Sequence, residues 1–188
     1  RETVLYGPGY ILDRLCGCTF GISPRSFYQV NPVQTRVLYE TAMEYGGLTG
    51  RELAVDAYCG TGTIGLIASR QARQVIGVES NREAVRDAVA NAKRNGIENA
   101  WFACEDAGRF LARMGQEGQR PDLLFLDPPR AGCGRQTLEA AAGLSPGRVV
   151  MVSCNPETLA RDLKLLCARG YRVEKAQPVD LFPHTAHV

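Results

Sequence analysis

From residue 52 onward, short apolar segments alternate with segments that have helical spacing. The apolar segments are rich in Val, Leu and Ile and span residues 52–57, 74–79, 100–104, 122–126 and 148–152. The segments with helical spacing span residues 63–73, 81–95, 107–115, 135–142 and 156–169. Strands without polar alternation are typical of sheets that are buried on both faces. The pattern therefore predicts an α/β fold with a doubly wound, mostly parallel sheet, and ligands at the carboxyl ends of its strands.

The two ends of the chain depart from this alternation. Residues 171–176 have the pattern of a sixth strand. Residues 1–50 mix polar and aromatic residues, with breaks at Gly7-Pro8-Gly9 and Ser23-Pro24 and helical spacing near residues 33–45. We therefore predict one domain over residues 51–188, and over residues 1–50 an appendage that packs on it.

Composition limits the class of protein. With 188 residues, 45% of them hydrophobic, the chain can bury one sizeable core. No segment approaches the ~20 consecutive apolar residues of a membrane span, and a net charge of +2 is compatible with nucleic acid without arguing for it. The seven cysteines lack the paired spacing of a metal site. We expect a monomeric protein without a metal, in the reduced cytoplasm, and part of a longer chain because the sequence does not begin with Met.

A glycine-rich loop, Gly60-Thr61-Gly62-Thr63-Ile64-Gly65, follows the first strand and opens the first helix. Gly60 and Gly62 permit a tight turn and a close approach of the backbone to a ligand, and the free N–H groups of a helix start favour anionic groups. Glu79 ends the next strand, where its carboxylate can accept the hydroxyls of a ribose. The pattern predicts an adenosine-type cofactor. A dinucleotide and a methyl donor fit it equally well, and a tight turn without a ligand is the simpler alternative.

Three further positions follow strands at the expected ligand-binding edge. Asp106 can hydrogen-bond an adenine amine or N-cap the next helix, and both interpretations can hold. Asp127 opens Asp127-Pro128-Pro129-Arg130, in which the prolines either fix an extended backbone facing the substrate or only stiffen a loop. Arg130 stands where enzymes that methylate amines of nucleobases carry an aromatic residue, which argues against that reaction. Cys154 precedes a helix that starts at Asn155-Pro156, which favours a thiolate nucleophile, although buried cysteines are usually inert.

Together these segments resemble the RNA uracil-5-methyltransferase family, S-adenosylmethionine-dependent enzymes that make 5-methyluridine in ribosomal and transfer RNA. The resemblance covers residues 21–188 and rests on motifs that follow one another in the family's order. They are Phe27-Tyr28-Gln29-Val30-Asn31, Asp56-Ala57-Tyr58-Cys59-Gly60-Thr61-Gly62-Thr63, Asp127-Pro128-Pro129-Arg130, Ser153-Cys154-Asn155-Pro156 and Pro178-Val179-Asp180-Leu181-Phe182-Pro183-His184-Thr185. The resemblance implies a Rossmann-like class I methyltransferase fold that lacks its last strand. It implies RNA as the partner, and the last motif favours ribosomal over transfer RNA.

The resemblance also assigns roles to individual residues. It implies that Cys154 is the nucleophile, that Asp127 holds the edge of the uracil, and that the loop with Gly60 and Gly62 binds the cofactor. The implied cofactor contacts are Gln29, Tyr58, Thr63, Glu79 and Asp106. The family's general base is a glutamate that would follow Val188, so we expect the chain as given to bind S-adenosylmethionine without turnover.

The implied reaction follows from the chemistry of uracil. Addition of the thiolate to C6 gives an enolate that is nucleophilic at C5, and this carbon takes the methyl group of S-adenosylmethionine. Asp127 would accept the N3–H, which uracil has and cytosine lacks, and the base must be flipped out of its stack. Two alternatives stay open. An NAD-dependent oxidoreductase leaves Asp127 and Cys154 unexplained, and a module without catalysis would only bind RNA or cofactor.

Overall fold

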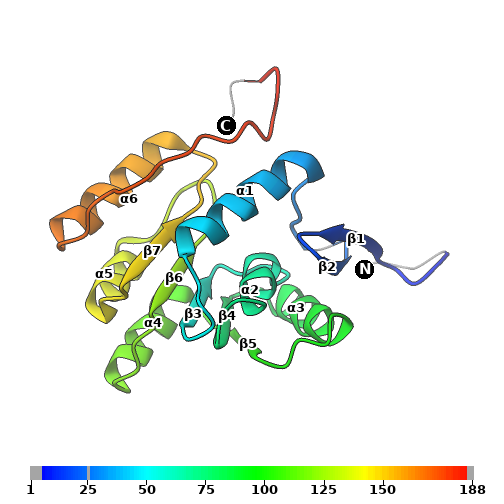
Figure 1. Ribbon diagram of the computed structural model, residues 1–188, viewed down its shortest axis with the longest axis horizontal. Helices are drawn as coiled ribbons and strands as arrows, with labels where there is room; N and C mark the ends of the chain where they lie inside the picture. The colour runs from blue at the N-terminus through cyan, green and yellow to red at the C-terminus, as the bar shows by residue number, and fades with distance from the viewer. Residues whose placement is uncertain (1–5, 25, 186–188) are drawn as a thin grey trace.

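A computed structural model describes residues 6–24 and 26–185 (Figure 1). Its centre is a parallel sheet of five strands in the order β5-β4-β3-β6-β7. The strands are β3 (Leu53–Ala57), β4 (Gln74–Glu79), β5 (Ala100–Cys104), β6 (Leu123–Leu126) and β7 (Arg148–Met151). These confirm the strands predicted between residues 52 and 152. The chain starts in the middle of the sheet at β3 and moves outward on both sides, so the order reverses between β3 and β6, where a doubly wound sheet forms its ligand crevice.

Helices connect the strands and cover both faces of the sheet. They are α1 (Pro32–Gly46), α2 (Thr63–Ser69), α3 (Arg82–Arg94), α4 (Ala107–Gln116), α5 (Arg135–Leu144) and α6 (Pro156–Ala168). Residues of α1, α2 and α3 belong to one hydrophobic cluster, and residues of α4, α5 and α6 belong to a second. Within residues 6–24 and 26–185, no helix has the length and apolar character needed to cross a membrane.

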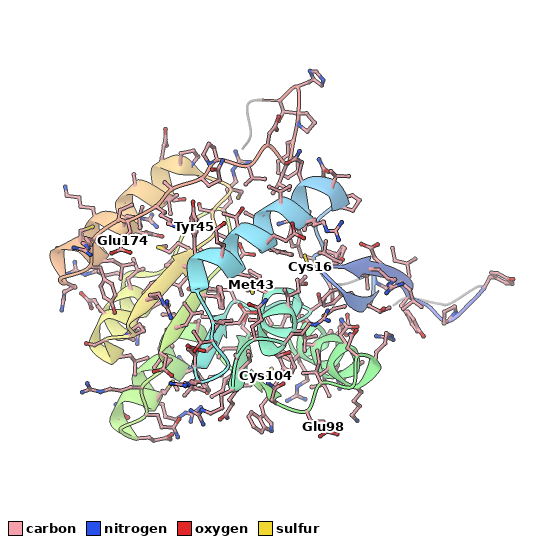
Figure 2. All side chains as sticks on the ribbon, viewed as in Figure 1. Cys16, Met43, Tyr45, Glu98, Cys104 and Glu174 are labelled. Carbon is pink, nitrogen blue, oxygen red and sulfur yellow. The ribbon has the colours of Figure 1, made fainter. Side chains whose placement is uncertain are left out.

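Strand β6 shows why this sheet is apolar on both faces. Leu123 and Phe125 belong to the cluster of α1–α3, whereas Leu124 and Leu126 belong to the cluster of α4–α6. Successive side chains of a strand point to opposite faces, so an uninterrupted apolar run needs apolar partners on both. Met43 is one such partner and lies on the side of α1 that faces the sheet (Figure 2).

Local sequence signals fix where several helices begin. Asparagine side chains cap α1, α3 and α6, with Asn31 accepting from Gln34 N, Asn81 from Glu83 N, and Asn155 from Glu157 N. Proline occupies the first turn of α1 and α6, where its missing N–H costs nothing. The helix predicted over residues 63–73 ends earlier, at Ser69, because the chain must turn within the next four residues to enter β4.

The structure contains a hairpin that the sequence pattern did not predict. β1 (Ile11–Leu15) and β2 (Cys18–Ile22) pair antiparallel across a turn in which Cys16 (φ 47°) and Gly17 (φ 80°) both have positive φ. Positive φ at both central residues is typical of the type I′ turn, which suits a two-residue hairpin. Phe20 of β2 is fully buried in the cluster of α1–α3, so the hairpin shares the core of the sheet.

The predicted sixth strand over residues 171–176 is wrong, because the chain there has no regular secondary structure. Among the described residues, β7 pairs only with β6, so residues 171–176 have no neighbouring strand with which to form a ladder. Side chains hold the segment instead. Tyr171 donates to the Pro146 carbonyl (3.0 Å), and Lys175 lies over the ring of Tyr45 (5.1 Å), near the end of α1 labelled in Figure 2.

Candidate active site

A cavity of about 1800 Å³ extends from the carboxyl ends of the strands along β7 to residues 170–177. It brings together most of the residues that the sequence singled out, from the loop before α1, the glycine-rich loop, β4, and the segments that follow β6 and β7. These are Gln29, Tyr58, Gly60, Thr63, Glu79, Asp127 and Cys154. Gly62 and Asp106 do not line it. One cavity therefore connects the predicted cofactor loop with the predicted nucleophile.

The glycine-rich loop adopts backbone conformations that few side chains tolerate. Tyr58, Gly60 and Gly62 all have positive φ, at 69°, 54° and 83°. A Cβ atom at Gly60 would meet nothing within 4 Å, whereas one at Gly62 would lie 3.0 Å from Phe102 and 3.1 Å from Ala88. Gly60 therefore keeps open space beside the cavity, while Gly62 is required for packing between the loop, α3 and β5. Only the first of these two roles concerns a ligand directly.

Glu79 ties the end of β4 to this loop. Its Oε2 accepts from Gly60 N (3.1 Å), and its Oε1 accepts from Asn81 N (2.7 Å) and from the Ser80 hydroxyl (3.2 Å). A carboxylate offers about four acceptor positions, and three are occupied. The carboxylate can accept one further ribose hydroxyl at once, and a second by exchanging the Ser80 hydroxyl.

Asp56 is a candidate site residue that sequence reasoning missed. It lies in β3, is fully buried and lines the cavity. Its Oδ2 accepts from Gly65 N (2.7 Å), whereas its Oδ1 is a buried side-chain oxygen without a hydrogen-bond partner in the described chain. Burial, together with the nearby carboxylates of Asp127 and Glu79, raises the pKa of Asp56 to about 8. The available signal was an acidic residue inside an otherwise apolar strand that runs into a glycine-rich loop.

Asp127 follows β6 directly and lies partly buried at the floor of the cavity. Desolvation raises the pKa of Asp127 to about 7. The buried hydroxyl of Tyr39 on α1 also has a pKa well above its ordinary value, first because of burial and then because of Asp127 and Asp56. The two carboxyl groups therefore lie close enough to each other and to Tyr39 to influence one another's protonation.

Cys154 is exposed at the cavity wall, between the end of β7 and the start of α6. The turn around it is held by Val152 N donating to the Leu126 carbonyl (2.9 Å) and by Asn155 N donating to the Ser153 hydroxyl (3.1 Å). Two other cysteines line the cavity. Burial raises the pKa of Cys59 well above its ordinary value, and Cys167 lies near the other end of α6, about 20 Å along the helix. Cys154 is the exposed thiol at the start of α6, the helix that also contacts the loop after Asp127.

Helix α6 also holds the loop that follows Asp127. Asp162, which is buried, accepts from Cys133 N through its Oδ2 (2.7 Å), and Arg161 donates to the Ala131 carbonyl (2.9 Å). Thr158 donates from its hydroxyl to the Arg130 carbonyl (3.4 Å). The same helix therefore starts beside Cys154 and anchors the loop after Asp127, which fixes the two predicted substrate-facing residues relative to one another.

Two other sequence predictions have more limited support in the geometry. Asp106 is exposed and N-caps α4, because its Oδ1 accepts from Arg109 N (3.0 Å), so its capping role is confirmed and its adenine contact stays a prediction. Gln29 is partly buried and lines the cavity. Close to it, Asn31 Nδ2 donates to the Leu181 carbonyl (3.2 Å), so the first and last sequence motifs meet in space. The chain end at Val188 lies outside the described residues.

No group of three or more His, Cys, Asp or Glu side chains in the described chain is arranged to hold a metal ion. The polar groups that line the cavity are two carboxyl groups of raised pKa, a third carboxylate that accepts from the backbone of the glycine-rich loop, and an exposed thiol. This set is suited to hydrogen bonding of a polar ligand and to nucleophilic attack by sulfur.

The chain was compared with known proteins and solved structures. The family described as tRNA (uracil-5-)-methyltransferase matches residues 18–188. An uncharacterized RNA methyltransferase of Caldanaerobacter subterraneus is 48% identical over 188 residues, and one of Halalkalibacterium halodurans is 50% identical. All of this chain is covered in both matches, but it spans only 42% and 41% of the relatives' length.

Solved structures share the fold. A tRNA (uracil-54, C5)-methyltransferase of Pyrococcus abyssi, solved with S-adenosyl-L-homocysteine, has a TM-score of 0.82 and 32% identity, covering 97% of this chain and 43% of that one. A SAM-dependent methyltransferase of Agrobacterium tumefaciens has a TM-score of 0.70 at 20% identity, covering 88% of this chain and 60% of that one, and shows the fold alone. The predicted Rossmann-like methyltransferase fold is thus confirmed. The chain belongs to the tRNA (uracil-5-)-methyltransferase family.

Proposed function

We propose that the protein transfers a methyl group from S-adenosylmethionine to C5 of a uridine in RNA, through a covalent bond between Cys154 and C6 of the base. The observation that carries the proposal is the single cavity lined by both the glycine-rich loop and the exposed thiol of Cys154. Methyl transfer requires that the methyl donor and the uracil lie next to each other in one cavity. The thiol that activates the uracil must reach the same base.

The cavity residues around the glycine-rich loop fit S-adenosylmethionine. When bound, this molecule supplies an electrophilic methyl group. Gly60 leaves open space for an approaching ligand, and Glu79 has acceptor capacity for ribose hydroxyls. The unpartnered Oδ1 of Asp56 is a buried acceptor at the cavity wall, and an ammonium group such as that of the methionine part would satisfy it.

The substrate half fits uracil. The Cys154 thiolate adds to C6, and the electron pair of the C5–C6 bond moves toward O4, which makes C5 nucleophilic. After C5 has gained the methyl group, a general base takes the C5 proton, the electrons of the C5–H bond re-form the C5–C6 double bond, and the C6–S bond breaks to release the thiolate. Asp127, when ionised, accepts the N3–H of uracil, and cytosine offers no proton at that position. A base that reaches Cys154 and Asp127 within the cavity must be flipped out of its stack, which costs a few kcal/mol.

The RNA class is part of the proposal. We take ribosomal RNA as the first candidate, because residues 178–188 resemble the ribosomal branch of the family, and transfer RNA as the second. The name of the matching family and that of the Pyrococcus abyssi protein both point to transfer RNA. Both RNA classes therefore belong in the same test.

The test is nucleoside mass spectrometry after a longer form of the protein, extended past Val188, is incubated with methyl-labelled S-adenosylmethionine and either unmodified ribosomal or unmodified transfer RNA. Label in 5-methyluridine supports the proposal, and the RNA that acquires it identifies the class. Label in a methylated cytidine or adenosine instead would overturn the assignment of Asp127. An Asp127→Asn variant serves as the matched control, because it keeps the shape of the side chain and removes its negative charge.

A further inference from the structure

Three polar residues at four-residue intervals, Asp87, Asn91 and Asn95, form one polar ridge along α3 and its C-cap. Residues four apart lie on the same side of a helix, one turn above the other. The ridge faces β2 and the segment after it, which lead toward Gln29. The sequence analysis assigned no role to these residues, and the proposed chemistry does not use them.

The two asparagines bond to the backbone of β2. Asn95 accepts from Thr19 N (2.7 Å) and donates to the Thr19 carbonyl (2.8 Å). Asn91 accepts from Gly21 N (2.7 Å) and donates to the Gly21 carbonyl (3.3 Å). Each amide thus satisfies both backbone groups of one residue. The side chains of α3 take the place that a further strand would occupy on this edge of the hairpin.

The ridge continues beyond β2. Asp87 Oδ2 accepts from the hydroxyls of Ser23 and Ser26, each at 2.6 Å. Ser26 lies three residues before Gln29, whose side chain belongs to the cavity lining. The ridge therefore holds β2, Ser23 and Ser26 against α3, on the way to the loop that carries Gln29.

Asn91 differs from its two neighbours because it also reaches the glycine-rich loop. Its Nδ2 donates to the Thr61 carbonyl (3.2 Å), and its Oδ1 accepts a second bond from Arg94 (2.6 Å). Asn91 is fully buried, so its two donors and two acceptor positions are all used inside the protein. A fully satisfied buried amide of this kind fixes the groups around it in one arrangement.

We propose that Asn91 is a positioning residue that couples the segment carrying Gln29 to the glycine-rich loop, so that both walls of the cofactor site are set together. This inference rests on the proposed function for its ligand. Asn91 itself does not line the cavity, and it acts through Thr61 on one side and through Gly21 on the other.

The test compares Asn91→Ala with Asn95→Ala. Both variants remove an amide that bonds to β2, but only Asn91→Ala removes the bond to Thr61. We expect both to lower the melting temperature. We expect only Asn91→Ala to weaken binding of S-adenosylhomocysteine in calorimetry, by about tenfold, which corresponds to the loss of one or two buried hydrogen bonds. Equal affinity in the two variants, with equal loss of melting temperature, would reduce Asn91 to a purely structural role.

A second readout does not depend on the ligand. Amide hydrogen exchange over residues 58–63 of the free protein should accelerate in Asn91→Ala and stay as in the wild type in Asn95→Ala. If the wild type binds neither S-adenosylmethionine nor S-adenosylhomocysteine, the proposed function fails, and the exchange comparison still decides the coupling. If Asn91→Ala does not fold, Asn91→Asp keeps the size and the Oδ1 acceptor, lacks the amide donor, and is compared in the same way.

Discussion

A pair of alanine substitutions in the glycine-rich loop separates backbone conformation from packing. Gly60 and Gly62 both have positive φ, so alanine at either position costs roughly 1–2 kcal/mol in the left-handed region. In both variants the unfolded chain also loses conformational freedom, which offsets about 0.4–1 kcal/mol of this cost. These contributions nearly cancel when the two variants are compared with each other.

What differs between the two sites is the space around the new methyl group. At Gly60 it meets nothing within 4 Å, whereas at Gly62 it lies 3.0–3.1 Å from Phe102 and 3.1 Å from Ala88. Ala88 is fixed in α3, and the Phe102 ring already packs so closely on Gly77 that a Cβ there would come within 2.5 Å of it. The ring therefore has little room to yield, and over-packing of this kind costs about 1–3 kcal/mol.

Gly62→Ala should accordingly be less stable than Gly60→Ala by about 1–3 kcal/mol. Urea unfolding followed by circular dichroism measures this difference, provided that the slope of the transition is the same for both variants. Equal urea midpoints for the two variants would refute the reasoning, because they would mean that the loop is not closely packed between α3 and β5.

Two further predictions concern charge and the division of roles within the cavity. The pKa of Asp56 is raised from 3.8 to about 8, so its stabilising contribution is fully present below about pH 4 and is lost as the pH rises toward 8. As the pH rises from about 5 to about 8.5, the melting temperature of Asp56→Asn should therefore rise relative to that of the wild type. A difference in melting temperature that does not change with pH would contradict the assignment. Glu79→Ala should weaken binding of S-adenosylmethionine by about 1.5–3 kcal/mol in calorimetry, as expected for loss of a charged acceptor. Asp127→Asn should leave this affinity near the wild type, and equal losses would show that the two carboxylates do not divide into ribose and uracil roles.

Much of the fold could be predicted from the sequence because local signals and burial agree. Strand β6 is apolar at every position and is buried on both faces, and Asn81 and Asn155 cap the helices that they precede. The strand predicted over residues 171–176 failed because a strand needs a partner, and the pattern of a single segment does not report whether one is present. The hairpin at Cys16-Gly17 was not predicted, although its turn residues both have positive φ, because a single glycine there does not specify the turn type.

The candidate site could be predicted where residues stand at strand ends. Cys154, Asp127 and Glu79 follow or end parallel strands, and such positions meet at one edge of the sheet. The contacts of Asn91 could not be predicted, because they join residues that are 30 and 70 positions apart in the chain. The raised pKa of Asp56 was also hidden, since it results from burial by side chains of several separate elements.

The most direct test of the central claim is covalent trapping on RNA that contains 5-fluorouridine. Fluorine at C5 replaces the proton whose loss would release the thiol, so in the presence of S-adenosylmethionine the Cys154–C6 bond should persist once C5 has been methylated. Mass spectrometry of the digested complex is expected to locate the nucleotide on the peptide that contains Cys154. The adduct should be absent from Cys154→Ala and present in Cys167→Ala, a matched variant of the other exposed thiol at the cavity. An adduct that survives in Cys154→Ala, or that maps to another cysteine, would contradict the account.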